Sequence, residues 1–396
     1  MTQKPRIAVV TSLGPTRLEP YGGNPISQTV LALQRWAEVE VFYTQESFPR
    51  WRIFQPRKFL YSRVDSRYFP PGIRAELVSF PAFPFVTRPF NGRACSRHLL
   101  PYLEKARPDV ILAYWLYPSG YGALLAGEKL GIPVIVGVRG SDLPAELDLL
   151  TGRLRKAAIR RASFVLTVSD ELRLRAIRLG VPSERVRSIH NGCDSSVFQV
   201  ADRQSARAQL GVESNAELIV FVGRLHPVKG LGDLMEAIPR LLPSYPRLEV
   251  VLIGEGILEG DLRARAARAD LAGHVRFLGR QSQPEVARWL AAADLLCLPS
   301  HSEGCPNAVL EALSCGRPVV ASHVGAIPEL VNSRCGILFP HGNVARLCEA
   351  ISEALACRWN ERTIASQYGR RWEDVGDETY EVCCTVVGKG TVAVSA

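Results

Sequence analysis

The sequence lacks several features that would assign it to a common class of protein. It contains no run of 18 uncharged apolar residues, so it has no candidate for a membrane-spanning helix. Its amino end enters the apolar run Arg6–Val10 without the apolar core and cleavage site of a signal peptide, so we expect no export signal. The ten cysteines form no Cys-x-x-Cys pair, which argues against a zinc site and favours reduced thiols. No Asp-x-Asp and no internal repeat occur.

The composition is that of a globular protein whose two halves differ in charge. With 396 residues, 47% of them hydrophobic and 22% charged, the chain is expected to form two domains. Residues 1–190 hold 28 Lys and Arg against 15 Asp and Glu, a net charge of +13. The remainder holds 20 against 24, a net charge of −4. The first half should therefore attract anions, and nucleic acid, an anionic membrane surface or a lipid phosphate would each fit this charge.

Short apolar runs alternate with helical patterns along most of the chain. The runs expected to form buried strands are Arg6–Val10, Val39–Tyr43, Pro108–Ala113, Gly131–Val138, Phe164–Ser169, Glu217–Val222, Leu248–Ile253, Val275–Gly279, Asp294–Pro299 and Pro318–Ala321. This alternation predicts an α/β fold with doubly wound parallel sheets. In such sheets, ligands bind beyond the carboxyl ends of the strands.

The segment from His301 to Gly316 holds two carboxylates, Glu303 and Glu311, between two expected strands. Pro306 suits the start of a helix and Gly316 its end. The N–H groups expected at the helix N-terminus, where the helix dipole is positive, are those of Gly304, Cys305 and Asn307. The segment therefore predicts a site for an anion or for sugar hydroxyls. The alternative is a surface helix with two solvated acids, which the otherwise apolar helix disfavours.

A second loop, at Gly223–Gly230, places Arg224 and Lys229 five residues apart after one strand and before a helix. Two cations with nearby amides suit a diphosphate leaving group. The alternative is a surface loop that happens to carry two basic residues. The pattern Gly254-Glu-Gly256-Ile-Leu-Glu-Gly260 is one residue too long for a dinucleotide fingerprint, and we do not interpret it as one.

Two loops of the first half could also approach a ligand. Gly22 and Gly23, between the first strand and the first helix, would let the backbone approach a phosphate, although a plain turn is the alternative. Arg139 and Asp142 follow an expected strand at its carboxyl end. Arg139 cannot act as a base near neutral pH, but it could clamp an anionic acceptor or a phosphate.

Residues 46–90 interrupt the alternation with eleven aromatic, eight basic and three acidic residues. Interleaved rings and cations suit a membrane interface, where rings lie at headgroup level and cations meet lipid phosphates. Single-stranded nucleic acid and simple packing of an insertion against the sheet are the alternatives.

The phrase from Glu303 to Ser322, together with Gly325–Glu329 and Gly223–Gly230, resembles glycosyltransferase family 4, a family of retaining enzymes with the GT-B fold. The resemblance implies two Rossmann-like domains that face a central cleft. It places an acceptor-side domain at residues 1–195 and a nucleotide-sugar domain at 196–360. It also implies that the tail, 361–396, forms a helix that packs back on the first domain.

The resemblance also implies roles for individual residues. Glu303, Arg224 and Lys229 would be the catalytic set, with Glu303 holding the donor sugar and the two cations holding the leaving diphosphate. The donor-binding residues would be Gly23, Gly223, Gly254, Arg280, Gly304, Cys305, Asn307 and Glu311, and Glu311 would hold the ribose. Arg139 and Asp142 would lie on the acceptor side. Arg139 stands where the family often has a histidine, as do Leu112 and Tyr114.

The function implied is metal-independent, retaining transfer of a sugar from a nucleotide-sugar donor to a polysaccharide or lipid-linked acceptor, with no further cofactor. A nucleotide-sugar epimerase or phosphorylase on the same fold is one alternative. A non-catalytic protein that binds sugar nucleotide or anionic lipid is another. We expect a cytoplasmic protein, attached peripherally to an anionic inner membrane face, and we do not expect nucleic acid as a partner. The sequence identifies neither the sugar and nucleotide nor the acceptor.

Overall fold

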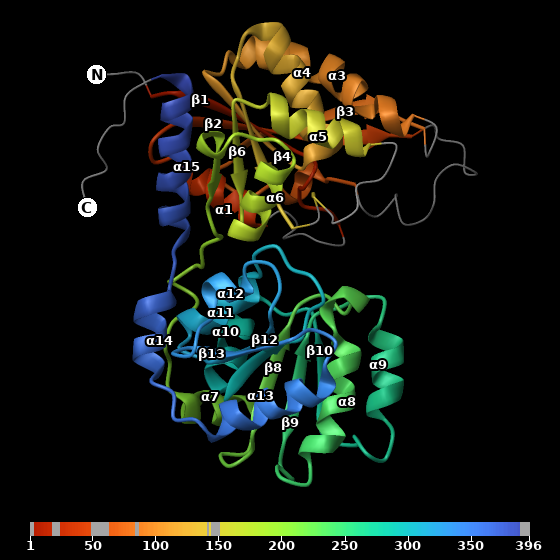
Figure 1. Cartoon of the computed structure of the whole chain (residues 1–396), viewed down its shortest axis with the longest axis vertical. Coiled ribbons are helices and arrows are strands. Elements are labelled where there is room, and N and C mark those ends of the chain that lie inside the picture. Colours follow the sequence, from red (N-terminus) through yellow and green to blue (C-terminus); the bar gives the residue numbers. More distant parts are fainter. Residues whose placement is uncertain are drawn as a thin grey trace. The chain divides into compact units, whose positions relative to one another are not determined.

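The computed structural model describes residues 4–17, 24–48, 63–83, 87–140, 142–143 and 151–388. The chain divides into two compact units, Met1–His190 with Trp372–Ala396, and Asn191–Arg371 (Figure 1). The predicted boundaries were 195/196 and 360/361. No helix among the described residues is long and apolar enough to cross a membrane.

The first unit is built on a seven-stranded parallel sheet with strand order β3-β2-β1-β4-β5-β6-β7. The strands are β1 (Arg6–Thr11), β2 (Glu38–Ser47), β3 (Arg74–Pro81), β4 (Val110–Tyr114), β5 (Val134–Val138), β6 (Phe164–Thr167) and β7 (Val186–Ser188). Ile7 of β1 lies opposite Val39 of β2 and Val110 of β4. The central strands are continuous apolar runs because both faces of a parallel sheet are covered by helices.

The helices of this unit are α1 (Asn24–Leu33), α3 (Asn91–Ala106), α4 (Tyr121–Leu130), α5 (Gly152–Arg161), α6 (Asp170–Arg178) and the C-terminal α15 (Trp372–Val387). α15 packs on α1 (Figure 1). Trp36, just beyond α1, stacks on Tyr380 of α15 with ring centroids 5.9 Å apart, and its indole N–H donates to Asp377 at 2.6 Å. A Cβ on Gly376 would lie 2.5 Å from that of Ala32, so the two helices approach closely at this glycine. The C-terminal helix is therefore part of the first core.

The second unit has a six-stranded parallel sheet with order β10-β9-β8-β11-β12-β13. Its strands are β8 (Leu218–Val222), β9 (Glu249–Ile253), β10 (Val275–Gly279), β11 (Leu295–Leu298), β12 (Val319–Ser322) and β13 (Gly336–Phe339). Its helices are α7 (Arg203–Leu210), α8 (Leu231–Leu241), α9 (Glu259–Ala266), α10 (Gln283–Ala292), α11 (Asn307–Ser314), α12 (Ile327–Leu330), α13 (Val344–Ala356) and α14 (Glu361–Tyr368).

The predicted fold, two Rossmann-like parallel sheets with a C-terminal helix against the first, is confirmed. The predicted tail helix from 361 is two helices, and the first, α14, belongs to the second unit. Glu361 at the start of α14 forms an ion pair with Arg317 at 2.7 Å, and the Arg317 side chain is buried. A buried guanidinium requires a partner, so this pair keeps α14 with the second unit.

Each sheet has one point at which the strand order reverses. It lies between β1 and β4 in the first unit and between β8 and β11 in the second. At such a point the loops that follow the two adjacent strands run in opposite directions and leave a crevice beyond the carboxyl ends. These two edges are therefore where the fold offers room for ligands.

Candidate functional site

At the reversal point of the second sheet, the loops after β8 and β11 touch through their backbones. Gly230 has φ +62°, and a Cβ there would lie 1.9 Å from the carbonyl oxygen of Pro299. The N–H of His301 donates to the carbonyl of Val228 at 2.8 Å. Only glycine combines this backbone conformation with this approach. Gly230 therefore fixes the position of Lys229, its neighbour in the chain, against the β11 loop.

The loop after β12 closes on the same place. Gly325 has φ +57°, and a Cβ there would lie 2.2 Å from the carbonyl oxygen of Glu303. The N–H of Ala326 donates to the carbonyl of Gly304 at 2.8 Å. Glu303 is therefore held between two neighbouring loops.

Lys229 and Glu303 meet at the centre of this arrangement. The Lys229 ammonium lies 2.6 Å from Oε1 of Glu303, and the Ser300 hydroxyl donates to the same oxygen at 2.6 Å. The side chains are only 17% and 8% exposed, respectively. Charges removed from water to this extent need a partner, and these two side chains supply one to each other. The site thus presents a positive and a negative group side by side.

The N-terminus of α11 adjoins this pair and is held by Asn191. The Asn191 amide donates to the carbonyl of Cys305 at 3.1 Å and to the Asn307 side chain at 2.8 Å. The N–H groups of a helix's first turn have no partners within the helix, and they lie at its positive end. This end of α11 is therefore suited to hold an anion or a hydroxyl oxygen next to Glu303.

Glu311 lies one turn further along α11. Burial raises its pKa to about 7, and no described residue donates a hydrogen bond to its carboxyl group. A buried carboxylate without donors is costly to ionise. Hydroxyl groups of a ligand could supply the missing hydrogen bonds.

Arg224 and the predicted glycines lie in the loops after β8 and β9. Gly223 and Gly254 have φ +157° and +139°, and a Cβ on Gly254 would lie 2.0 Å from the carbonyl oxygen of Gly223. The Arg224 side chain is exposed, and no described acidic residue pairs with it. Arg280, after β10, lies 3.9 Å from Glu255. The loops of these strands therefore meet, with Arg224 free to turn towards a ligand.

Other predicted residues fall elsewhere. Arg139 and Asp142 belong to the first unit, where the Asp142 carboxyl accepts from the N–H groups of Arg139 at 2.8 Å and Leu116 at 3.1 Å. These two hydrogen bonds let the carboxyl shape the loop after β5, and burial raises the pKa of Asp142 to about 6. Arg139 lies over the ring of Tyr114, 5.1 Å from its centroid. Gly23 and residues 49–62 of the basic-aromatic stretch lie outside the described residues.

Sequence reasoning missed Ser300 and Asn191, which hold the pair and the helix end. Their only sequence signal is that each follows a strand directly or within a few residues, at the carboxyl edge of its sheet. Among the described residues, no three His, Cys, Asp or Glu side chains converge in a way that could hold a metal ion.

Comparison with known families matches both units. The family described as "Glycosyl transferases group 1" matches residues 216–357, and that described as "Glycosyl transferase 4-like domain" matches residues 25–192. The chain is 30% identical to D-inositol 3-phosphate glycosyltransferase 1 of Catenulispora acidiphila, over 87% of this chain and 86% of that protein.

It is also 33% identical, over 69% of its length, to TuaC of Bacillus subtilis (strain 168), which its name assigns to teichuronic acid biosynthesis as a glycosyltransferase. Four curated relatives, TuaC among them, are matched over only 51% to 65% of their own length.

Solved structures show the same fold at low sequence identity. Anabaena HepE in complex with UDP is 21% identical, with a TM-score of 0.74, over 96% of this chain and all of that chain. Sucrose-phosphate synthase from Thermosynechococcus elongatus is 17% identical, also with a TM-score of 0.74, over 97% of this chain and all of that chain.

Proposed function

This chain belongs to the glycosyl transferases group 1 family, and on that basis we propose that it transfers a sugar from a nucleotide-sugar donor to a glycan or lipid-linked acceptor, with retention of anomeric configuration. The observation that carries the proposal is the Lys229–Glu303 pair at the reversal point of the second sheet. A nucleotide sugar needs both signs of charge there, because its diphosphate is anionic while its sugar hydroxyls donate hydrogen bonds.

In the proposed reaction, an acceptor hydroxyl oxygen bonds to the anomeric carbon of the sugar as the bond from that carbon to the diphosphate oxygen breaks. The diphosphate leaves with the electron pair and takes the acceptor proton, and Lys229 and Arg224 stabilise its charge. Preorganised cations in a shielded site favour the developing charge without having to reorganise. Glu303 and the N-terminus of α11, with Gly304, hold the donor sugar. The half-buried Glu311 accepts hydrogen bonds from the ribose hydroxyls, as acidic residues do in other nucleotide sites. Two cations at the leaving group make a bound metal unnecessary in this scheme.

The relatives support the donor class more than the acceptor. One solved structure with this fold contains UDP-glucose, bound to Anabaena HepE. The relatives' names differ, since one names D-inositol 3-phosphate and the other teichuronic acid biosynthesis. The names therefore give this chain no single acceptor, and the acceptor has to be sought in its own first unit.

The proposal includes attachment to an anionic membrane surface, where a lipid-linked acceptor would be presented. The net charge of +13 on residues 1–190 favours such a surface. Within this part, α5 contains five basic residues and no acidic residue: Arg153, Arg155, Lys156, Arg160 and Arg161.

A donor-hydrolysis assay tests the proposed activity. The full chain is incubated with UDP-, GDP- and ADP-sugars, with and without EDTA, and the release of free sugar is followed. The proposal predicts slow release from at least one donor and the same rate with EDTA. Epimerised donor without free sugar would indicate an epimerase. Saturable binding of a donor without any turnover would indicate a non-catalytic binding protein.

A further inference from the structure

Two phenylalanine side chains of the first unit, both between β3 and α3, are exposed to water. Phe83 is 47% exposed and Phe90 is 60% exposed, the largest exposed fractions of any Phe, Tyr or Trp among the described residues. A ring of this size is stabilised by leaving water, so exposed rings that lie together favour a contact surface. Whether these two lie together depends on the backbone between them.

Thr87 joins the backbones of the two phenylalanines. The N–H of Phe83 donates to the Thr87 hydroxyl at 2.7 Å, and that hydroxyl donates to the carbonyl of Phe83 at 3.0 Å. The N–H of Phe90 donates to the carbonyl of Thr87 at 2.7 Å. Both exposed rings are therefore carried by one hydrogen-bonded segment.

This segment is anchored to the loop after β4. The hydroxyl of the buried Tyr117 donates to the carbonyl of Arg88 and accepts from the N–H of Gly92 at 3.2 Å. A Cβ on Gly92 would lie 2.6 Å from the ring of Tyr121, so the start of α3 lies close against α4, its neighbour in Figure 1. The two rings are therefore held in place at the carboxyl edge of the first sheet.

Basic side chains continue this surface along α3. Arg93 and Arg97 lie three and seven positions after Phe90, so the helical period places them on the same face, and all three are exposed. The other face, which includes Leu99, is buried. No described residue pairs with the guanidinium groups of Arg93 and Arg97, and Glu104, the only acidic residue of α3, lies near its other end. This half of α3 is therefore positive.

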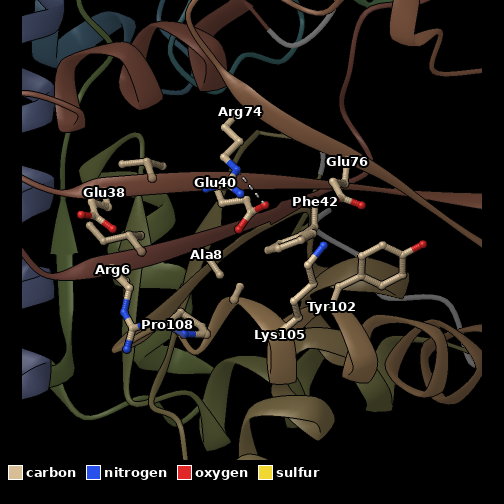
Figure 2. Close-up of a pocket in the computed structure, with 13 residues that line it drawn as sticks. Arg6, Ala8, Glu38, Glu40, Phe42, Arg74, Glu76, Tyr102, Lys105 and Pro108 are labelled. Atoms are coloured by element: carbon tan, nitrogen blue, oxygen red, sulfur yellow. Dashed lines mark ion pairs between the residues drawn. The ribbon is translucent and has the colours of Figure 1, made fainter.

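The amino edge of the same sheet differs in charge. A pocket of about 230 Å³ there is lined by three basic and three acidic side chains (Figure 2): Arg6, Arg74, Lys105, Glu38, Glu40 and Glu76. Arg74 and Glu40 point toward each other, 3.5 Å apart (Figure 2). Because its charges balance, this edge offers no preference for an anionic surface, and it supplies a control below.

We propose that Phe83, Arg88, Phe90, Arg93 and Arg97, together called the phenylalanine patch, dock on an anionic lipid bilayer. This rests on the membrane attachment proposed above and assigns it to particular residues. The two rings enter the headgroup region, where aromatic side chains are favoured, and the guanidinium groups meet lipid phosphates. The carboxyl edge of the first sheet then faces the bilayer.

A second copy of the chain fits the phenylalanine patch less well than a bilayer does. A two-fold contact places the same surface of each copy against the other. The three arginines of one patch would then face the three of its partner, and the patch contains no acidic residue to balance them. Charge complementarity therefore favours lipid phosphates.

Sedimentation of the full chain with vesicles tests the role of the rings. The vesicles are of phosphatidylcholine, with or without phosphatidylglycerol. The double variant Phe83→Ser, Phe90→Ser should bind the anionic vesicles about tenfold or more weakly than the wild type, since burial of one ring is worth at least this factor. The matched control, Leu31→Ser with Leu174→Ser, removes two exposed apolar side chains elsewhere on the same unit and should bind as the wild type does.

A second double variant, Arg93→Gln with Arg97→Gln, tests the role of the charges. It should also bind about tenfold or more weakly, at about fivefold for each cation, and its binding should depend less on salt. The phenylalanine variant should keep the salt dependence of the wild type because it removes no charge. The control, Arg74→Gln with Lys105→Gln, removes two cations from the balanced amino edge and should bind more tightly than the arginine variant.

Equal sedimentation of either patch variant and its control would overturn the proposal. The arginine variant changes only exposed helix positions, so it decides even if the phenylalanine variant does not fold. Light scattering without lipid tests the other occupant: a wild type that dimerises and a phenylalanine variant that does not would assign the patch to a second copy.

Donor hydrolysis is measured on the same samples. If the wild type does not bind anionic vesicles, the proposed membrane attachment fails together with the patch. If the wild type binds and both patch variants bind like their controls, only the patch assignment fails. If the patch behaves as expected but no donor is hydrolysed, the proposed transferase activity fails and the docking surface stands.

Discussion

Lys229 and Glu303 each depend on the other for charge balance, since both side chains are largely shielded from water. Replacing Lys229 with Ala removes a cation from the leaving group and leaves the Glu303 carboxylate buried beside Ser300. We expect the activation free energy of donor hydrolysis to rise by about 3 kcal/mol, the scale of losing one preorganised electrostatic group. This lowers kcat on the order of a hundredfold. Steady-state kinetics measures this loss. The exposed Lys129→Ala is the control, and unchanged kcat in Lys229→Ala would remove the leaving-group role.

The ionisation of Glu311 should make the stability of the folded chain depend on pH. Its pKa of about 7 lies above the ordinary 4.5, so the folded chain holds this proton more tightly than the unfolded chain does. The resulting stability is fully present below about pH 4.5 and is lost as the pH rises through about 7. Glu311→Gln stays neutral, so its stability relative to the wild type should increase from about pH 5 to about pH 8, by at most about 3 kcal/mol.

Urea unfolding at the two pH values measures this difference, with the exposed Glu349→Gln as the control. A difference between Glu311→Gln and the wild type that does not change with pH would show that Glu311 ionises normally.

The loops that follow β8, β11 and β12 act as one element, because glycines at their contacts leave no room for a side chain. Gly230 and Gly211 share a left-handed backbone, with φ +62° and +65°, but a Cβ on Gly211 would meet nothing within 4 Å. Gly211→Ala should therefore cost only the backbone strain, about 1–2 kcal/mol. Gly230→Ala should cost more and should also reduce donor turnover, since its Cβ would displace Lys229 from Glu303.

Thermal unfolding and donor hydrolysis of the two alanine variants provide the comparison. Equal stability and equal activity of the pair would show that the close approach to Pro299 has no consequence for the site.

The strands that sequence reasoning predicted are those with an unbroken apolar run, such as β1 and β8. β3, β7 and β13 were missed for different reasons. β3 is an edge strand whose buried and exposed residues alternate only in its last part, within a stretch rich in proline and aromatic residues. β7 has only three residues, too few to show a period. β13 is an edge strand whose two central residues are only partly buried, whereas the equally short β11 and β12 are fully buried. Periodicity therefore finds the centre of a sheet more readily than its edges.

The division of the carboxyl-terminal helices between the two units could not be predicted from a local sequence pattern. Sequence reasoning predicted a single tail helix, whereas α14 and α15 belong to different units. What separates them is the pair between Glu361 and the buried Arg317, which lie 44 positions apart in the sequence. The pairing of charges in the candidate site also depends on residues that are distant in the sequence. Lys229 and Glu303 were each predicted from their own loops, but their direct pairing depends on the strand order β8-β11 and could not be read from either loop.

The net positive charge of residues 1–190 predicts that the chain binds an anionic membrane surface. The protein should sediment with anionic vesicles at low salt and be released at high salt, with about 1 kcal/mol per basic residue near the surface. A variant with Ser at the two aromatic positions and Gln at the four basic positions should bind less and still hydrolyse donor; the positions are Trp51, Phe54, Arg50, Arg52, Arg57 and Lys58.

The matched control also removes four positive charges, each from an exposed ion pair of the second unit: Arg240, Arg263, Arg288 and Arg346, all changed to Gln. If the six-residue variant binds vesicles as well as this control does, the basic-aromatic stretch packs within the first unit and a soluble acceptor fits better.

Binding of a nucleoside diphosphate to the reversal point of the second sheet is the most direct test. Calorimetric titration of UDP, GDP and ADP into the wild type, Lys229→Ala and Lys129→Ala measures it. We predict that at least one of the three binds the wild type and Lys129→Ala with equal affinity, and binds Lys229→Ala about tenfold or more weakly, because a charge-assisted contact is lost. Failure of all three to bind the wild type, or equal affinity for Lys229→Ala, would contradict a diphosphate site at Lys229.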